Sequence, residues 1–295
     1  MNSRVRSDRP TGTPHGNTNP ENQLRSGQVI TLLGALALLL IMAPAVMAQC
    51  AQPPTGTMVA WYPLDTYGVN VATRSREILS SVLPYQVAGE VNFGLGFDGV
   101  DTYVGSPDSI LTNFGPAGKS PCKGNFSSCS GDFSIEAWVN LQGHRPSLPE
   151  AIVDKRGPGP IGYSFYINAN RIGLQLADGT GAVGYDNYDS PGVAALGGTS
   201  WHHVAVTVNR TKAIHWFVDG VAHGSTTPAH TGSLVNTAPL IIGANGPDNP
   251  GGFFKGWLDE VTIYNRALTA AEVKAIHTAG PSGKCGNIYA GSFQP

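Results

Sequence analysis

Residues 201–220 constrain the fold more than any other segment, because they read as two strands joined by a polar turn. In the first strand, valines at 204, 206 and 208 alternate with His203, Ala205, Thr207 and Asn209, which is the period of two of a strand with unlike faces. Residues 209–212 supply the turn, and residues 214–218 the returning strand, closed by Asp219–Gly220. The segment predicts an antiparallel hairpin and holds no nucleophile, paired acid or ligand cluster.

The same pattern recurs along the chain. Short apolar or alternating runs between turn signals predict strands at 58–64, 96–97 leading to 102–105, 133–141, 151–155, 162–168, 171–177, 201–209, 213–218, 239–243 and 256–264. With 38 Gly and 22 Pro, the composition suits many short strands and tight turns. One helix is expected at 268–279, capped by Thr269 with Glu272 and stopped by Gly280–Pro281. The expected class is all-β, a two-sheet antiparallel sandwich with one short C-terminal helix.

The first 48 residues differ in kind from the rest. Residues 1–28 are polar, and residues 29–43 form an uncharged apolar run shorter than the ~20 residues of a comfortable membrane span. Residues 46–48 offer a signal cleavage site, with Gln49 as the new N-terminus. We therefore expect a signal peptide at 1–48, one domain at 49–286 and a tail at 287–295, in a secreted, periplasmic or cell-surface protein. The alternative is a membrane anchor formed by an uncleaved segment at 29–48.

The charge balance bears on partners. The chain carries 18 basic and 20 acidic residues, and four of its arginines lie in the leader, so the exported part is the more acidic. This balance argues against a nucleic-acid partner, whose phosphates require a basic surface.

Four cysteines, Cys50, Cys122, Cys129 and Cys285, all lie in the exported part. An even count in an oxidising compartment favours disulfides, and three pairings are possible. We favour Cys122 with Cys129, which lie seven apart in a Gly/Ser/Pro-rich loop, and this pairing leaves Cys50 and Cys285 to join the ends of the domain. A zinc site is less favoured, because no Cys-x-x-Cys spacing or neighbouring His occurs.

An ordered set of short motifs resembles the laminin-G-like domains of the concanavalin A-like lectin/glucanase superfamily, in their bacterial secreted form. The matching segments are Met-Val-Ala-Trp-Tyr-Pro at 58–63, Phe-Asp-Gly-Val-Asp-Thr-Tyr-Val at 97–104, Phe-Ser-Ile-Glu-Ala-Trp-Val at 133–139, Trp-His-His-Val-Ala-Val-Thr at 201–207, Phe-Val-Asp-Gly at 217–220, residues 256–268 and the ending at 279–285. Each motif alone is weak, but their order across residues 50–286 is specific. The resemblance implies a jelly-roll sandwich of two curved antiparallel sheets.

Some relatives of this sandwich are glycosidases. Glycoside hydrolysis needs two carboxyl groups ~5 to 9.5 Å apart, and no Glu-x-Asp-x-x-Glu segment supplies them. Glu136 stands alone, Glu150 lies in a Pro-rich loop, and Asp259 and Glu260 are consecutive, so on a regular strand they point to opposite faces. We expect no enzymatic activity, and keep a carbohydrate-active hydrolase as a lesser alternative.

His202 and His203 are also adjacent on a strand, so their rings should diverge, with His215 able to face either one across the hairpin. A metal site is the less favoured interpretation. We expect structural histidines, one of them fixed by a backbone hydrogen bond.

Calcium is the cofactor that the resemblance implies, since many superfamily members carry this ion between the N-terminal region, a mid-chain turn and the last strand. Ca²⁺ takes six to eight oxygen ligands. Matched to this chain, the ligands would be Asp98, Gly99, Asp101 and Asp259, with Asp65 a further contributor. The alternative, that Asp98 and Asp101 merely close a turn through side-chain to backbone bonds, stays open.

For ligand binding, Tyr185, Asp186, Asn187 and Tyr188 form an aromatic and acidic cluster in an expected loop. Such a cluster suits sugars, because a ring face lies beside directional polar groups. A domain of this size also needs aromatics in its core, so packing is the competing interpretation.

The sequence therefore predicts an exported, non-catalytic recognition module that binds carbohydrate or a cell-surface protein through its loops or its concave face. The alternative of another class is a structural adhesion or envelope protein. The sequence gives no ligand identity, because loop chemistry varies freely on a shared scaffold.

Overall fold

The computed structural model describes residues 49–54, 56–65, 70–72, 78–79, 82–118, 131–143, 149–180, 184–193, 196, 198–246 and 252–285, all within one unit, Ala48–Pro295. The predicted leader at 1–48, the tail at 287–295, Cys122 and Cys129 lie outside these residues, and what was expected of them stays a prediction. Within the described residues, no helix combines the length and apolar character needed to cross a membrane.

Strands are the dominant regular element of the described structure. They are β1 (Met58–Tyr62), β2 (Ile78–Leu79), β3 (Tyr85–Ala88), β4 (Phe93–Asp98), β5 (Val104–Ser106), β6 (Phe133–Leu141), β7 (Glu150–Gly157), β8 (Ile161–Asn168), β9 (Arg171–Asp178), β10 (Asp186–Asp189), β11 (His202–Asn209), β12 (Ala213–Val218), β13 (Val221–Thr226), β14 (Leu240–Ile242) and β15 (Lys255–Tyr264). The helix α2 spans Ala270–Ala279, and short 3-10 turns lie at Ile110–Thr112 and Gly280–Ser282.

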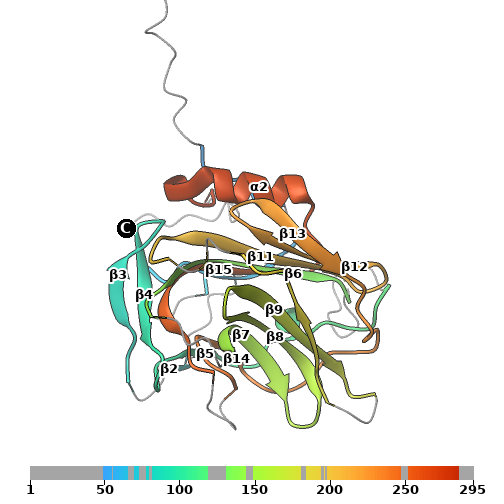
Figure 1. Cartoon of the computed structure of the whole chain (residues 1–295). Coiled ribbons are helices and arrows are strands. Elements are labelled where there is room, and N and C mark those ends of the chain that lie inside the picture. Colours follow the sequence, from blue (N-terminus) through green and yellow to red (C-terminus); the bar gives the residue numbers. More distant parts are fainter. Residues whose placement is uncertain are drawn as a thin grey trace, which may run out of the picture. The chain divides into compact units, whose positions relative to one another are not determined.

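These strands form two antiparallel sheets that pack as layers (Figure 1). The eight-stranded sheet runs β13-β12-β11-β6-β15-β4-β3, with β1 also paired to β15. The seven-stranded sheet runs β10-β9-β8-β7-β14-β5-β2. Helix α2 lies on the outer side of the eight-stranded sheet, away from the other layer (Figure 1). The predicted all-β sandwich with one short C-terminal helix is confirmed.

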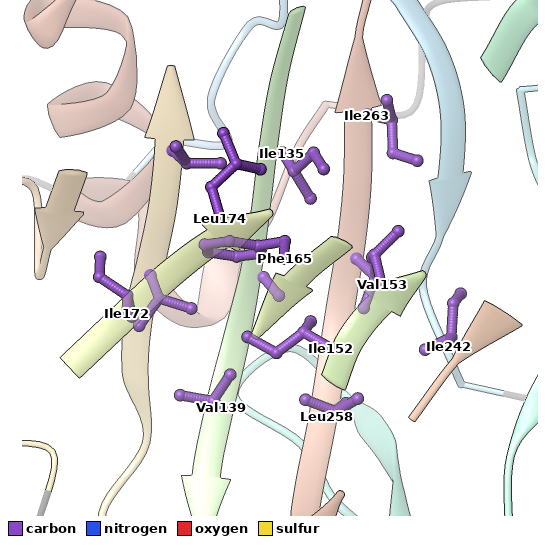
Figure 2. Close-up of a cluster of buried hydrophobic side chains, with 14 of the residues drawn as sticks. Ile135, Val139, Ile152, Val153, Phe165, Ile172, Leu174, Ile242, Leu258 and Ile263 are labelled. Carbon is purple, nitrogen blue, oxygen red and sulfur yellow. The ribbon is translucent and has the colours of Figure 1, made fainter. Parts of the chain in front are cut away.

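The main core lies between the sheets and is built from apolar side chains that the central strands direct inward (Figure 2). On β11, Val204, Val206 and Val208 are fully buried, as the period of two predicts. Figure 2 shows their counterparts on neighbouring strands, including Ile135, Val139, Phe165, Leu174 and Leu258. At roughly 1.5 to 3 kcal/mol for each large apolar side chain, this burial is the main stabilising contribution.

A second, smaller core lies between the eight-stranded sheet and α2. It is built from buried apolar residues of the sheet, the helix and the chain near the disulfide: Ala51, Ala205, Phe217, Tyr264, Leu268, Val273, Ile276 and Ala279. The helix begins as predicted, because the Thr269 side chain accepts from the backbone of Glu272 and Glu272 reciprocates in a capping box.

The hairpin predicted at residues 201–220 is confirmed by the pairing of β11 with β12. Val204 pairs with Val218 and Val208 with Ile214, and β12 ends at a turn in which Asp219 and Gly220 have φ of 50° and 72°. Two successive positive φ values are what a two-residue hairpin turn needs, and Gly adopts them at little cost. This turn leads into β13, an edge strand that the sequence pattern did not predict.

Candidate functional site

The outer face of the seven-stranded sheet carries a row of polar residues. Asn187 of β10 pairs with Gln175 of β9, Gln175 with Ser164 of β8, and Ser164 with Asp154 of β7. Partners in a ladder point to the same side, so the four side chains cross the sheet in line. Their exposure falls from Asn187, which is exposed, to Asp154, which is fully buried.

Arg156 lies two residues after Asp154 on β7, so both side chains are on the same face, and its hydrogen bonds connect this row. Its Nε donates to Asp154 Oδ2 at 2.6 Å, and its Nη1 donates to Gln175 Oε1 at 2.5 Å. The guanidinium also lies over the ring of Tyr185, 5.4 Å from its centroid, in a cation–π contact. Burial raises the pKa of Asp154, and the charge and hydrogen bonds of Arg156 oppose that rise. We call these five residues, Asp154, Arg156, Gln175, Tyr185 and Asn187, the Arg156 face.

Tyr185 is held firmly at the edge of this face. Its hydroxyl accepts from the Ile161 backbone N–H at 3.2 Å and lies 3.0 Å from the Ile161 carbonyl oxygen. A ring fixed at its hydroxyl end and flanked by a guanidinium is already ordered before a ligand arrives. Binding on it therefore costs little side-chain conformational entropy.

The predicted cluster at 185–188 is therefore only partly brought together. Residues 186–189 form the edge strand β10, so the expectation of a loop is wrong, and strand alternation divides the cluster between two faces. Tyr188 packs against the core, and its hydroxyl accepts from Ala229 N at 2.9 Å. Asp186 turns to His230, 3.2 Å from its Nε2. Tyr185 and Asn187 remain on the outer face, while Arg156 and Gln175 were missed because their grouping depends on ladder register.

The five predicted calcium ligands lie in two places. Asp98 Oδ1 accepts from the backbone of Val100 at 2.8 Å and of Asp101 at 3.2 Å, so it closes its own turn. Asp98, at the start of that turn, pairs with Lys255 of β15. Lys255 lies four positions before Asp259 on the same strand, so the turn and Asp259 are separated along β15.

Asp65 and Asp259 instead support the β3–β4 connection. Asp65 accepts from Phe93 N at 3.0 Å and Asp259 from Val91 N at 2.8 Å. Among the described residues, no three His, Cys, Asp or Glu side chains gather in a way that would hold a metal. The described residues thus do not assemble the five as one ligand set, and calcium binding stays an untested prediction.

The adjacent histidines are held by carboxylates and not by a backbone bond, which corrects that expectation. His203 Nε2 lies 3.2 Å from Glu136 Oε2, and His202 Nδ1 lies 2.9 Å from Asp219 Oδ2. His215 pairs with Thr207 and is exposed, so it faces neither of them.

Glu136 is not alone either. Lys284 Nζ lies 3.0 Å from Glu136 Oε1 and 2.6 Å from Glu260 Oε2, and all three residues are buried. Burial alone would raise the pKa of Glu136, but the charge of Lys284 and the hydrogen bond to His203 outweigh it and lower the pKa from 4.5 to about 2. We call Glu136, His203, Glu260 and Lys284 the Lys284 cluster.

The geometry of β15 explains how Glu260 joins this cluster. The pairing register with β6 shifts between Asp259 and Thr262, and Glu260 has a positive φ of 56°. Such a bulge turns both Asp259 and Glu260 to the outer side, which corrects the expectation of opposite faces. Glu136 and Glu260 are both buried and share Lys284 as their ion-pair partner.

The disulfide between Cys50 and Cys285 ties the two ends of the described domain, with Cα atoms 4.9 Å apart. Around it, Ala51 N donates to Gly283 O and Cys285 N to Ala51 O, each at 2.8 Å. This clamp holds Lys284 against the sheet.

Comparison with known proteins identifies the class. The model of the concanavalin A-like lectin/glucanases superfamily matches residues 115–274, more than half of the chain. The chain belongs to this superfamily. No curated protein sequence matches it.

Solved structures share the fold at low identity. The binding domain of Paraclostridial Mosquitocidal Protein 1 superposes with a TM-score of 0.57 at 14% identity, over 75% of this chain and 52% of that one. The binding domain of botulinum neurotoxin DC in complex with rat synaptotagmin II gives 0.53 at 12%, over 75% and 51%. This chain thus spans about half the length of these toxin domains.

Domain 4 of AbnA, an extracellular arabinanase from Geobacillus stearothermophilus, was solved in complex with arabinotriose. It gives a TM-score of 0.52 at 16% identity, over 74% of this chain and 96% of that one. These likenesses show the fold, and the neighbours are mainly binding domains.

Proposed function

We propose that this chain is an exported, non-catalytic module that binds carbohydrate through the Arg156 face. The observation that carries the proposal is the fixed grouping of a guanidinium, an amide and an aromatic ring on an outer sheet face. Sugars present hydroxyl groups beside apolar C–H faces, so they are recognised by planar hydrogen-bonding side chains placed next to rings.

The electrostatics of the face fit a neutral ligand. The Arg156 charge is already balanced by Asp154, with Arg156 Nη2 only 2.5 Å from Asp154 Oδ2. Its side chain keeps 20% exposure while that of Asp154 has none, so the ion pair presents hydrogen-bond donors outward with little net charge. An uncharged glycan would therefore meet directional groups at a small desolvation cost.

The test is a glycan array followed by calorimetric titration of each hit. We expect saturable binding that falls at least about tenfold in Gln175→Ala and Tyr185→Ala, since each removes one directional or stacking contact. Lys274→Ala, exposed on α2, is the matched control and should bind as the parent does. Glycan binding indifferent to both face variants would refute this location.

Two companion assays address the alternatives. Steady release of reducing ends from a bound polysaccharide would overturn the non-catalytic part of the proposal. Silence across the array, with adhesion of the protein to intact cells, would favour the structural adhesion role. Calcium support is a separate proposal, tested by whether a strong chelator lowers the melting temperature or the glycan affinity.

A further inference from the structure

A second group of aromatic side chains lies on the other sheet, on the part of its outer face near β3. Tyr85 of β3 pairs with Gly96 of β4, Gly96 with Trp257 of β15, and Trp257 with Asn140 of β6. Trp201, just before β11, approaches Trp257 with ring centroids 6.2 Å apart. We call Tyr85, Trp257 and Trp201 the Tyr85 strip.

Glycines make room for this strip. A Cβ at Gly96 would lie 2.4 Å from Tyr85 Cζ and within 2.9 Å of two further ring atoms, so the Tyr85 ring lies flat across Gly96. A Cβ at Gly94 would lie 3.5 Å from Trp201 Cη2. Both glycines face the same side of β4. The rings therefore rest on bare backbone, and one face of Tyr85 points outward, with the residue 52% exposed.

The strip is also fixed in place. Trp257 Nε1 donates to the Tyr85 hydroxyl oxygen at 3.2 Å, which joins the rings of two strands that are not neighbours. Within the described part of the chain, the Tyr85 O–H has no acceptor, so it can donate to a ligand. Beside the rings, the half-buried Gln142 donates from Nε2 to Oδ1 of the buried Asn140 at 2.6 Å, which places one amide at the edge of the strip.

From this geometry we infer that the Tyr85 strip is a second carbohydrate site, which takes a neutral, extended polysaccharide chain laid across the strands. The Tyr85 ring reaches across β4 to contact Trp257, and the Trp257 ring lies 6.2 Å from that of Trp201, so the three side chains form one continuous aromatic row that runs across the strands. The outward face of Tyr85, with its hydroxyl and the Gln142 amide beside it, matches pyranose or furanose units better than an apolar helix. The inference rests on the proposed carbohydrate recognition but uses the opposite sheet.

Two sites on opposite sheets have a functional consequence. One molecule can hold two polysaccharide chains or two stretches of one chain, so binding to an insoluble polymer should exceed what either face achieves alone.

The test uses the exported protein and defined probes: arabino-oligosaccharides, cello-oligosaccharides and the corresponding soluble polymers. Calorimetry should report two sites per chain, and Tyr85→Ala should leave one. Affinity at the lost site should fall about tenfold or more, as expected when a stacked ring is removed. Tyr85→Phe keeps the ring face and should retain most of the binding. Tryptophan fluorescence should change on binding in the parent and in Tyr185→Ala, and the change should be smaller in Trp257→Phe, which keeps only Trp201 in the strip.

The outcomes separate this inference from the proposed function. Loss of all glycan binding in Tyr185→Ala, with Tyr85→Ala binding as the parent does, would overturn the strip and leave the Arg156 face standing. Loss of all glycan binding in Tyr85→Ala, with Tyr185→Ala binding as the parent does, would support the strip and overturn the Arg156 face. If no glycan binds, and light scattering shows a dimer that Tyr85→Ala dissociates, the strip is an interface between copies and the inference is wrong.

Discussion

The outer faces of the two sheets differ in how far the rest of the chain covers them. On the eight-stranded sheet, α2 and the segment that ends at Cys285 cover the middle of the face, and the charged groups of the Lys284 cluster are sealed beneath them. On the seven-stranded sheet, the Arg156 face pairs a buried carboxylate with groups that reach solvent. The same strand pattern thus serves stability on one side and leaves polar groups available on the other. Substitutions beneath α2 and the segment that ends at Cys285 should cost folding free energy, whereas those on the Arg156 face should cost binding.

The largest expected effect is the loss of the disulfide on the covered side. In Cys50→Ser/Cys285→Ser, the free energy of unfolding should fall by about 5 kcal/mol in the chain-entropy model, because the bond closes a loop of 235 residues. Equilibrium denaturation in urea measures this change. Replacing both cysteines leaves Cys122 and Cys129 untouched, which reduction would not. A loss below about 1 kcal/mol would show that the backbone bonds around Ala51 suffice as the clamp.

Next comes the lysine of the buried cluster. Lys284→Met removes the cation that faces Glu136 and Glu260, and leaving a buried charge without its partner costs about 3 to 5 kcal/mol. Lys274→Met, exposed on α2, is the matched control and should change stability by less than about 0.5 kcal/mol. Equal denaturation midpoints for the two variants would mean that the cluster contributes no more than a surface lysine.

The pH dependence of stability gives a third, smaller effect. Glu136 has its pKa lowered from 4.5 to about 2 in the folded protein, so its stabilising charge is fully present above pH 4.5 and is lost as the pH falls toward 2. The free energy of unfolding should therefore decline over that window. In Glu136→Gln the decline should be shallower, as followed by urea denaturation at several pH values. An unchanged slope would assign the acid sensitivity to other carboxyl groups.

The sequence predicts best those features that depend on residues close together in the chain. The bounds of β6 and β12 were predicted to the residue, and the cap at Thr269 is confirmed, because alternation and capping are read over a few positions. The edge strands β10 and β13 were missed, since their residues are polar or exposed and they become strands only through their partners.

The two faces were harder to predict because their contacts are long-range. Lys284 meets Glu136 across 148 residues, and the bulge that turns Glu260 outward depends on a backbone angle that the side-chain pattern does not encode. Likewise, Arg156 and Gln175 are joined by the register of β7, β8 and β9. Periodicity tells which residues lie on a face, but only pairing tells which of them meet.

The smallest expected effect on stability is that of a substitution on the Arg156 face. Gln175→Ala removes one acceptor from Arg156, which keeps its bonds to Asp154, so the free energy of unfolding should change by less than about 1 kcal/mol. Ser134→Ala on the covered face should cost more, about 1 to 3 kcal/mol, because its buried hydroxyl donates to Arg266 O and accepts from Leu268 N. Thermal denaturation ranks the two. If Gln175→Ala proves the more destabilising, the Arg156 face is part of the structural framework, and its polar row would no longer favour a ligand.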